Sequence, residues 1–466
     1  MVKLNRMSLN EDTIAAIATP HGVGGIGIIR ISGPEAEKIG FRLFRPKQAT
    51  VSFRSHHLYH GDIVVPETGM ILDEVLLTVM RKPHSYTGED TVEIHCHGGP
   101  ALVDGILKAV LAEGARPAEP GEFTKRAFLN DRMDLSQAEA VINLIHAQTN
   151  RGIELALSHL KGRLSHKVQS LRSSLIDILS HFEITIDFTE EDLELTSYSN
   201  TSGMIRQIID NIGEILATYR EGKIASSGLT VVITGKPNVG KSSLLNKLLG
   251  EQRAIITPIP GTTRDFIEGD LHIKGIPIKL IDTAGVRNGE DVIEKEGIKL
   301  VWEKASVADV VIILLDGSTA LTAEDREVID RNKGKQSMVV INKSDLPHIL
   351  NDGDLEDIHT HIPHRISAKR GDGLAELREK LYAIARKALN DDDQSDIVLT
   401  NLRHKEAFER ASEHLHAAYA AVLQGMSPEF SALDIIEALD ALGEIVGDTA
   451  PEDVLDRIFS TFCIGK

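Results

Sequence analysis

The glycine-rich segment 235–242 (GKPNVGKS) constrains the fold of this chain more than any other feature. It follows the apolar run 229–234, and a strand that leads through a glycine-rich loop into a helix is the phosphate-binding arrangement of P-loop proteins. Alone, the loop could be an ordinary tight turn. Four more nucleotide motifs follow it in the expected order, however: Pro260-Gly261-Thr262-Thr263, Asp282-Thr283-Ala284-Gly285, Asn342-Lys343-Ser344-Asp345 and Ser367-Ala368-Lys369. The ordered set predicts a GTPase domain.

The phosphate and metal positions of this domain are complete. Lys241 is expected to contact the β- and γ-phosphates of GTP, and Ser242 to bind Mg²⁺ through its hydroxyl. Thr263 is the expected second protein ligand of Mg²⁺, and it reports the γ-phosphate by ordering its loop. Asp282 ends an apolar strand and should hold the metal through its water shell, while Gly285 can turn its N–H toward the γ-phosphate. Lys241, Thr263 and Gly285 are therefore predicted to act in catalysis.

Base selection depends on Asp345. Its carboxylate can accept both N–H donors on one edge of guanine, whereas adenine lacks that pair of donors. The sequence therefore predicts a preference for GTP over ATP.

The position that often carries a catalytic glutamine is Val286 in this chain, which cannot orient a water molecule. Glu294, on a helix expected over 290–305, is the candidate replacement, although a solvated glutamate on a helix face is the simpler interpretation. No arginine finger can be assigned. Asn238 lies within the phosphate loop, and its side-chain oxygen could help to bind a monovalent cation beside the phosphates.

Composition limits the class of protein. A chain of 466 residues predicts roughly three domains. The formal charge of −18 argues against an overall basic surface for nucleic acid, so any RNA contact should be local or shared with a partner. Only two cysteines occur, Cys96 and Cys463, and neither a signal peptide nor an apolar run of 18 residues is present. We expect a soluble, cytoplasmic protein with no membrane segment.

The residue pattern changes along the chain, which predicts a multidomain protein. Residues 1–130 contain β-branched segments at 13–18, 26–31, 71–80 and 91–96, separated by turn residues, and predict an α+β domain. Residues 131–228 predict the first half of an all-α helical domain. Residues 229–388 predict an α/β P-loop domain of the Ras type. An acidic linker at 390–394 precedes further helices at 404–423 and 432–446, so 389–466 predicts the second half of the helical domain, with the GTPase domain inserted between the halves.

Two details of the helical half can be predicted. Ser136 and Glu139 have the spacing of a capping box and would open the first helix. Apolar residues then recur every three or four positions and predict one long helix with a buried stripe: Leu157, Leu160, Leu164, Val168, Leu171, Leu175, Ile178 and Phe182. Such a stripe is more often a bundle core than a partner-binding surface.

Outside the nucleotide motifs, seven segments carry a family resemblance. They are 19–34 (TPHGVGGIGIIRISGP), 86–90 (YTGED), 97–100 (HGGP), 116–124 (RPAEPGEFT), 128–131 (FLND), 187–192 (DFTEED) and the C-terminal 463–466 (CIGK). Over essentially its whole length the chain resembles the bacterial tRNA-modification GTPases of the MnmE/TrmE type.

The resemblance implies an N-terminal domain that dimerises and binds 5-formyl- or methylene-tetrahydrofolate. It implies a complex with an FAD-dependent partner, of the heterotetramer type, that adds a carboxymethylaminomethyl-type group to carbon 5 of the wobble uridine of certain tRNAs. The positions that match the family's folate contacts are Arg30, Glu89, Arg132 and Lys466, with arginine at 132 where lysine is expected. Arginine retains the charge but changes the contact geometry.

The resemblance also assigns nucleotide and cation ligands. Asn238, Thr257, Ile259 and Thr262 match the potassium ligands, with Ile259 acting through its carbonyl, and Glu294 matches the residue that orients water. The complete predicted GTP-binding set is Asn238, Val239, Gly240, Lys241, Ser242, Ser243, Thr257, Thr262, Thr263, Asp282, Thr283, Ala284, Gly285, Asn342, Lys343, Asp345, Ser367, Ala368 and Lys369.

Several alternative interpretations stay open at this point. Segment 22–27 fits the G-x-G-x-x-G dinucleotide pattern, but a strand rather than a helix is expected after it. His95-Cys96-His97 offers too few ligands for zinc. Cys463 is either incidental or a reactive thiol near the folate. As a whole, the chain could instead be a ribosome-assembly GTPase, which should carry a basic RNA-binding appendage that this sequence lacks, or a folate-binding scaffold with vestigial GTPase activity, which the intact motifs disfavour.

Overall fold

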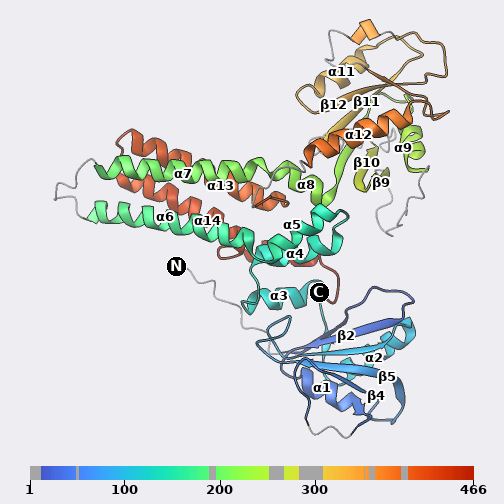
Figure 1. Cartoon of the computed structure of the whole chain (residues 1–466), viewed down its shortest axis with the longest axis vertical. Helices are drawn as coiled ribbons and strands as arrows, with labels where there is room; N and C mark the ends of the chain where they lie inside the picture. The colour runs from blue at the N-terminus through green and yellow to red at the C-terminus, as the bar shows by residue number, and fades with distance from the viewer. Residues whose placement is uncertain are drawn as a thin grey trace, which may run out of the picture. The chain divides into compact units, whose positions relative to one another are not determined.

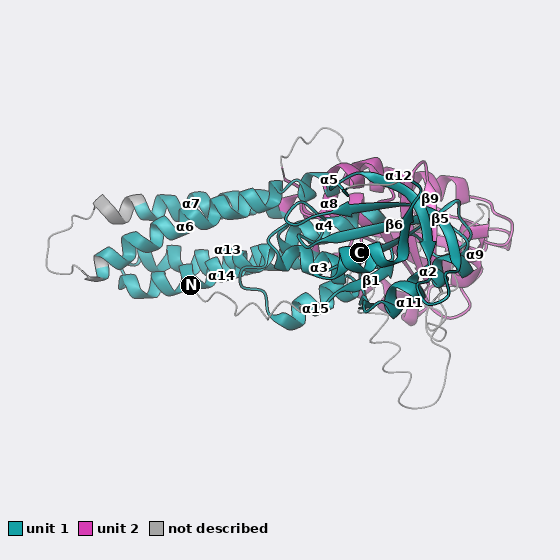
Figure 2. Cartoon of the chain, turned by 90° about the horizontal axis from the view of Figure 1, so that it is seen from below, with its two compact units in different colours: residues 1–145, 156–216, 402–466 teal, residues 146–155, 217–401 magenta. Residues whose placement is uncertain are grey.

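The computed structural model describes residues 12–48, 52–187, 196–250, 267–282, 308–350, 352–355, 363–389 and 397–466. The chain forms two compact units, which are coloured separately in Figure 2. The first unit comprises residues 1–145, 156–216 and 402–466, and the second comprises 146–155 and 217–401. None of the described helices combines the length and apolarity that a membrane span requires.

The N-terminal part of the first unit is an α+β layer structure. Its seven-stranded sheet has the order β3-β4-β5-β6-β2-β1-β7. The strands are β1 (Ile14–Ile17), β2 (Ile26–Ser32), β3 (Phe44–Pro46), β4 (Leu58–Val64), β5 (Ile71–Met80), β6 (Thr91–His97) and β7 (Arg116–Pro117). Helices α1 (Ala36–Leu43) and α2 (Pro100–Ala112) pack on one face of this sheet and close its core. The four strands predicted from the sequence are confirmed.

Alternation along β2 determines which side chains face the core. Ile29 and Ile31 are buried in the core, whereas Arg30 projects to the other face and lies opposite Glu93 of β6. Because the glycine-rich segment 22–25 leads into this antiparallel strand and not into a helix, it does not form a dinucleotide-binding turn.

The helical part of the first unit is built from two segments of the chain, one before and one after the nucleotide motifs. Its helices are α3 (Glu122–Leu129), α4 (Leu135–His146), α6 (Arg163–Asp187), α7 (Thr196–Ala217), α13 (Leu402–Leu423), α14 (Pro428–Val446) and α15 (Glu452–Ser460). In Figure 1, α6, α7, α13 and α14 run side by side as a bundle. Residues on either side of the nucleotide motifs thus join in one unit, as expected for an inserted GTPase domain.

Two local predictions for this region are wrong. The long helix predicted over 157–182 is two helices, α5 (Asn150–Leu160) and α6, because Gly162 has a positive φ of 82° and ends the first one. The capping box is formed by Asp134 and Gln137, whose side chains each accept a hydrogen bond from the other's backbone N–H (3.0 and 2.9 Å). Glu139 instead lies inside α4.

The second unit is a doubly wound α/β domain. Its six-stranded sheet has the order β13-β12-β11-β8-β10-β9, and only β9 is antiparallel to its neighbour. The strands are β8 (Leu229–Thr234), β9 (Ile267–Ile273), β10 (Ile276–Asp282), β11 (Val310–Asp316), β12 (Ser337–Asn342) and β13 (His364–Arg365). The helices are α8 (Tyr219–Ser227), α9 (Lys241–Gly250), α11 (Ala323–Arg331), the 3₁₀ turn η2 (Asp352–Leu355) and α12 (Leu374–Ala388).

Both faces of this sheet are buried, which explains its nearly continuous apolar strands. Along β11, Ile312 and Leu314 face the core shared with α9 and α12, and Val311 and Ile313 face the core shared with α11. The predicted fold class, an α+β domain and a helical domain with an inserted α/β P-loop domain, is therefore confirmed.

Candidate functional site

The phosphate loop joins the end of β8 to the start of α9, so the first backbone N–H groups of α9 are available to an anion. Lys241 is folded over the loop, and its ammonium group donates to the carbonyls of Gly235 (2.7 Å) and Lys236 (3.0 Å). Burial lowers the pKa of this ammonium group, while the carboxylate of Asp282 acts in the opposite direction. The loop thus presents a buried cation at the position expected for the phosphates.

The candidate magnesium position lies between two neighbouring parallel strands. Ser242 lies in the first turn of α9, directly after the phosphate loop that follows β8, and Asp282 is the last residue of β10. The Ser242 hydroxyl donates to Asp282 Oδ2 at 2.7 Å, and Asp282 is fully buried. A hydroxyl and a carboxylate are the hard oxygen ligands that Mg²⁺ prefers, directly or through water, so these two residues fit the predicted metal.

Asn342 connects the phosphate loop to both base-recognition loops. Its amide donates to the carbonyl of Val239 at 2.8 Å, and its side-chain oxygen accepts from the backbone N–H of Ala368 at 2.9 Å. Gly240 (φ 101°) is needed beside it, because a Cβ there would lie 2.3 Å from Asn342 Nδ2. Three motifs that are far apart in the sequence are therefore joined through one buried side chain.

Asp345 is oriented by a hydroxyl from the neighbouring motif. Ser367 donates to Asp345 Oδ1 at 2.8 Å, and this bond holds the pKa of the Asp345 carboxyl below its ordinary value. The carboxylate is therefore ready to accept N–H donors from a base. Lys343 has a positive φ of 68° and pairs with Asp316 at 2.5 Å, which anchors the same loop on β11.

Sequence reasoning missed two residues that support the phosphate loop. Lys236 donates to Asp325 at 2.7 Å. Asp325 is the third residue of α11 and forms a capping box with Thr322, the N-cap of that helix. The sequence T-x-x-D at 322–325 is a capping signal that could have been found, but its pairing with a lysine 89 positions away could not.

A second polar site lies in the N-terminal domain and involves the C-terminal tail. Arg30 donates to Glu93 (2.8 Å) and to the carbonyl of Gly465 (3.2 Å), and its guanidinium lies 5.3 Å from the centre of the Tyr86 ring. The ammonium group of Lys466 lies 5.8 Å from the same ring. Burial and the nearby Arg30 lower the pKa of Lys466. The site thus gathers two cations at one aromatic ring.

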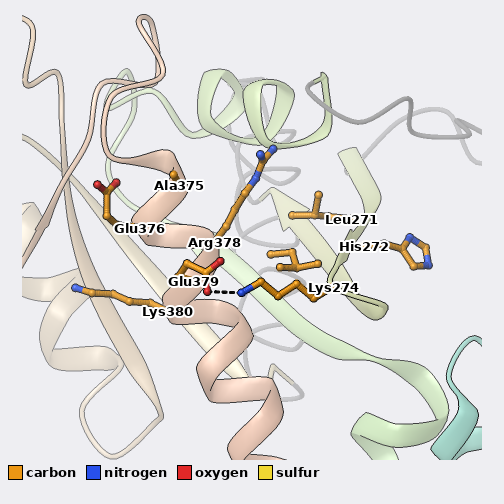
Figure 3. Close-up of a pocket in the computed structure, with 9 residues that line it drawn as sticks. Leu271, His272, Lys274, Ala375, Glu376, Arg378, Glu379 and Lys380 are labelled. Atoms are coloured by element: carbon orange, nitrogen blue, oxygen red, sulfur yellow. Dashed lines mark hydrogen bonds and ion pairs between the residues drawn. The ribbon is translucent and has the colours of Figure 1, made fainter.

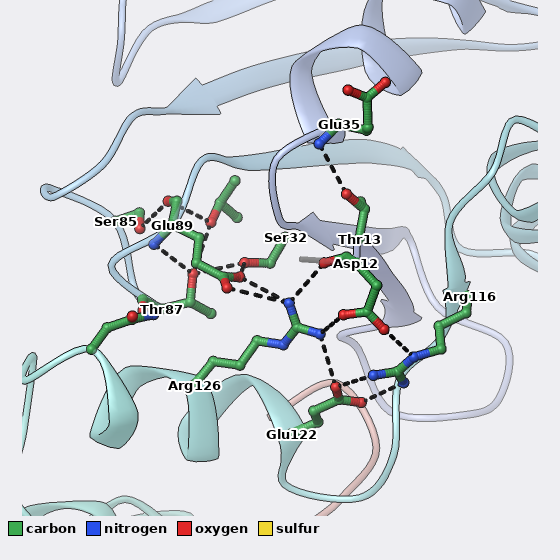
Figure 4. Close-up of polar contacts among 12 residues, drawn as sticks. Asp12, Thr13, Ser32, Glu35, Ser85, Thr87, Glu89, Arg116, Glu122 and Arg126 are labelled. Carbon is green, nitrogen blue, oxygen red and sulfur yellow. Dashed lines mark hydrogen bonds and ion pairs between the residues drawn. The ribbon is translucent and has the colours of Figure 1, made fainter. Parts of the chain in front are cut away.

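Two more predicted cofactor residues are Glu89, in the loop 85–89, and Arg132, which contacts that loop. Glu89 accepts from Ser32 at 2.8 Å and from Arg126, a residue that was not predicted. Arg132 donates to the carbonyl of Ser85 at 3.0 Å, so it contacts the same loop. Figure 4 shows the contacts of Glu89 with Ser32, Ser85 and Arg126.

The two cysteines lie in different surroundings. Cys96 is buried in the sheet core, and burial raises the pKa of its thiol to about 11. Cys463 is exposed in a turn closed by a bond from Lys466 N to its carbonyl (3.2 Å). His95 and His97 contact Glu93 and Asp73 respectively.

Two family models together match nearly the whole chain. A model described as the MnmE helical domain matches residues 135–463, and one described as the N-terminus of GTP-binding protein TrmE matches residues 13–132. A tRNA modification GTPase MnmE from Syntrophus aciditrophicus (strain SB) is 53% identical over 460 residues, covering 98% of this chain and 100% of that protein. The chain belongs to the MnmE family of tRNA modification GTPases. It is accordingly a GTP hydrolase.

A second relative agrees with membership of the MnmE family. A tRNA modification GTPase MnmE from Geobacter sulfurreducens is 44% identical, covering 98% of this chain and 99% of that protein. Among solved structures, the G domain of the T. maritima FeoB iron transporter is 28% identical, covering 34% of this chain and 98% of that chain. The TM-score of this comparison is 0.28.

Part of the site predicted for this MnmE-family protein lies outside the described residues. These residues are Thr257, Ile259, Thr262, Thr263, Thr283, Ala284, Gly285 and Glu294. Of the others, Val239 is buried in the core beside β8, and Ser243 and Lys369 are exposed.

One cavity of this MnmE-family protein is separate from its nucleotide motifs. It has a volume of about 620 Å³ and lies between the end of β9 and the first turns of α12 (Figure 3). Lys274 and Glu379 form an ion pair of 2.8 Å at its wall. None of its described lining residues belongs to the predicted GTP-binding set, so this cavity is not the nucleotide site.

Proposed function

We propose that this MnmE-family GTPase hydrolyses GTP in a potassium-dependent reaction and works with an FAD-dependent partner protein. Together they add a carboxymethylaminomethyl-type group to carbon 5 of the wobble uridine of certain tRNAs. The observation that carries the proposal is that the similarity to curated tRNA modification GTPases extends over 98% of the chain rather than over the nucleotide domain alone. The decisive experiment is mass spectrometry of tRNA nucleosides from a deletion strain, in which the modified wobble uridine should be lost.

The nucleotide site is proposed to bind GTP with Mg²⁺. Ser242 and Thr263 would hold the metal, with Asp282 acting through its water shell, and Mg²⁺ would neutralise charge on the phosphates. Lys241 would contact the β- and γ-phosphates, and Asp345 would select guanine. Substituting Asp345→Asn presents a donor where xanthine carries an oxygen, so the variant should prefer XTP. A variant that still prefers GTP would remove this assignment of base selection.

Hydrolysis is proposed to depend on K⁺ and Glu294. Asn238, Thr257, Ile259 and Thr262 would hold the potassium ion, and Glu294 would orient the attacking water. An arginine finger supplies about 10³–10⁵ in rate in other GTPases, and a bound cation can supply part of that stabilisation. Among the described residues, Asn238 supports the proposal, because it lies in the phosphate loop with a left-handed backbone (φ 62°) and is exposed.

The potassium proposal is tested by GTP turnover at fixed ionic strength in KCl and in NaCl. Wild type should be faster in KCl, and Asn238→Ala should lose the difference. Equal turnover in both salts, unaffected by Asn238→Ala, would favour a finger supplied by a partner protein instead.

The N-terminal domain is proposed to bind 5-formyl- or methylene-tetrahydrofolate. Arg30 and Lys466 are suited to a carboxylate of the glutamate tail because both are cations near the Tyr86 ring. Glu89 can accept N–H donors of the pterin ring, and Arg132 would contact the ligand from the same loop region. Calorimetry with 5-formyl-tetrahydrofolate should show binding to wild type and weaker binding to Glu89→Ala.

Assembly is proposed to involve a homodimer that joins its FAD-dependent partner in a heterotetramer-like complex in the cytoplasm. Support for self-association comes from apolar side chains that β2, β4 and β5 leave exposed, namely Ile26, Leu58, Ile71 and Leu76. With a net charge of −18, tRNA binding should rest on local contacts or on the partner.

The exposed tail thiol is proposed to take part in modification. Cys463→Ser should leave GTP turnover nearly unchanged and impair tRNA modification. Full modification by this variant would make the thiol incidental.

A further inference from the structure

Arg126 is the centre of a charged cluster beside the proposed folate residues (Figure 4). It lies on α3, and only 6% of its side chain is exposed. One of its terminal nitrogens donates to Asp12 Oδ1 (2.7 Å) and to Glu122 Oε1 (3.0 Å). The other donates to the Asp12 carbonyl (3.0 Å) and lies 3.3 Å from both oxygens of Glu89. A buried guanidinium is tolerated because carboxylates surround it.

Glu89 is held from the protein side by several groups at once. Ser32 donates to Glu89 Oε2 at 2.8 Å, and the Ser32 hydroxyl is itself bonded to Thr87 at 2.7 Å. The backbone of Glu89 is also tied down, because its N–H donates to Thr87 Oγ1 (3.2 Å) and its carbonyl accepts from Ser85 (2.5 Å). Since 17% of the Glu89 side chain stays exposed, part of the carboxylate is accessible to a ligand.

We propose that Arg126 is a positioning residue that fixes the Glu89 carboxylate for ligand binding. The ligand class is a ring that presents N–H donors, such as the 2-amino-4-oxo edge of a pterin, so the inference rests on the folate site proposed above. Arg126 does not touch the ligand. It acts by holding one carboxylate in one orientation, which lowers the cost of ordering that side chain when the ligand binds.

Arg116 provides a natural control for this role. Like Arg126, it binds Asp12 (2.5 Å) and Glu122 (2.6 Å), but none of the described contacts joins it to Glu89. It is also more exposed, at 37% of its side chain. Substituting Arg116 therefore removes a bond from Asp12 and from Glu122 but leaves the bonds to Glu89 in place. The comparison distinguishes general stabilisation of the domain from positioning of Glu89.

The carboxylates account for the charge on Arg126. Burial opposes that charge, but Glu89, Asp12 and Glu122 together raise the pKa of the guanidinium. The cluster contains two guanidinium groups and three carboxylates, so it carries one net negative charge. Glu89 is the member of the cluster that belongs to the proposed cofactor set, and because 17% of its side chain is exposed, its charge is available to N–H donors.

The first experiment needs no ligand. Hydrogen–deuterium exchange is measured on the full chain for wild type, Arg126→Gln, Arg126→Lys and Arg116→Gln, with thermal melting to confirm folding. Segment 85–90 should exchange faster in Arg126→Gln, by about tenfold or more, because the charge-assisted bonds to Glu89 are lost. Arg116→Gln should leave this segment as in wild type. Equal exchange in wild type and Arg126→Gln would overturn the proposal.

The second experiment measures 5-formyl-tetrahydrofolate binding by calorimetry. Arg126→Gln should raise Kd about 10- to 100-fold, Arg126→Lys should recover part of the loss, and Arg116→Gln should stay within about threefold of wild type. In a Glu89→Gln background, Arg126→Gln should have little further effect, because it acts through Glu89. Additive losses, or an equal loss in Arg116→Gln, would reduce Arg126 to a structural role.

The two experiments separate this inference from the proposed function. If wild type does not bind 5-formyl-tetrahydrofolate, the proposed cofactor is wrong. The exchange comparison then still accepts or rejects Arg126 as the residue that holds Glu89. If neither Arg126→Gln nor Arg126→Lys folds, Ser32→Ala is measured in their place. Ser32 is the second side-chain donor to the Glu89 carboxylate.

Discussion

Replacing Asn342 by alanine should weaken GTP binding far more than it weakens the fold. The side chain is buried and makes two bonds, one to the Val239 carbonyl in the phosphate loop and one to the Ala368 N–H in a base loop. A buried polar group that loses its partner costs about 1–3 kcal/mol. In the free protein the loops can relax and let water reach both groups, so most of the cost should appear when GTP draws the loops together.

The expected loss is roughly 2–4 kcal/mol of binding free energy, or about 30- to 700-fold in Kd. Fluorescent GTP-analogue titration measures the affinity, and thermal melting measures the stability. Val339→Ala is the matched control, because Val339 lies on the same strand but is buried among apolar side chains on the face toward α11. It should cost about 1–3 kcal/mol of stability and leave affinity unchanged. If Asn342→Ala binds GTP within about threefold of wild type, the bridging argument is wrong.

Three further predictions concern other parts of the chain. Burial favours the neutral form of Glu139, but two basic residues of α13 lower the pKa of its carboxyl from 4.5 to about 2. The charged carboxylate therefore contributes about 3 kcal/mol to folding stability above pH 4.5, and this contribution is lost as pH falls toward 2. Urea midpoints of wild type and Glu139→Gln should therefore converge in that window, and parallel curves would contradict the assignment. Gly465→Ala should expel the C-terminal tail, because a Cβ there would lie 2.3 Å from a carbonyl of β1; carboxypeptidase should then remove Lys466 faster, as read by mass spectrometry. Lys236→Met should lower the thermal midpoint by leaving the Asp325 carboxylate without its cation, a cost of about 1–3 kcal/mol, whereas Lys236→Arg should restore most of it.

Much of the fold and of the nucleotide site followed from local patterns. The apolar strands 229–234 and 310–316 are buried on both faces of a parallel sheet, and such strands read as continuous apolar runs. Phosphate and base motifs lie at the ends of these strands, and parallel strands bring their carboxyl ends to one edge of the sheet. Ser242 and Asp282 therefore meet although 40 residues separate them, which motif order alone could anticipate.

Predictions from local patterns were wrong where a nearby residue changed the local structure. Apolar spacing continues through residue 162, so it predicts an unbroken helix, but the left-handed glycine there turns the chain. The result leaves Leu157 38% exposed, while Leu164 and Phe182 enter the bundle core. Likewise, Ser136 and Glu139 have the spacing of a capping box. In the structure Asp134 caps α4, and Glu139 accepts a hydrogen bond from Arg403.

The sequence by itself determined the fold class, the order of the nucleotide motifs and the chemistry that each can perform, because those properties depend on neighbours within a few residues. Tertiary structure decided which distant charges meet. Arg403 pairs with Glu139 across 264 positions, and Arg30 reaches the Gly465 carbonyl across 435. Arg126 joins Glu89 in the same way, and no spacing along the chain marks it. The physical reason is that a buried charge must be neutralised by whichever opposite charge the packed elements bring beside it, and that choice is made only when the chain has folded.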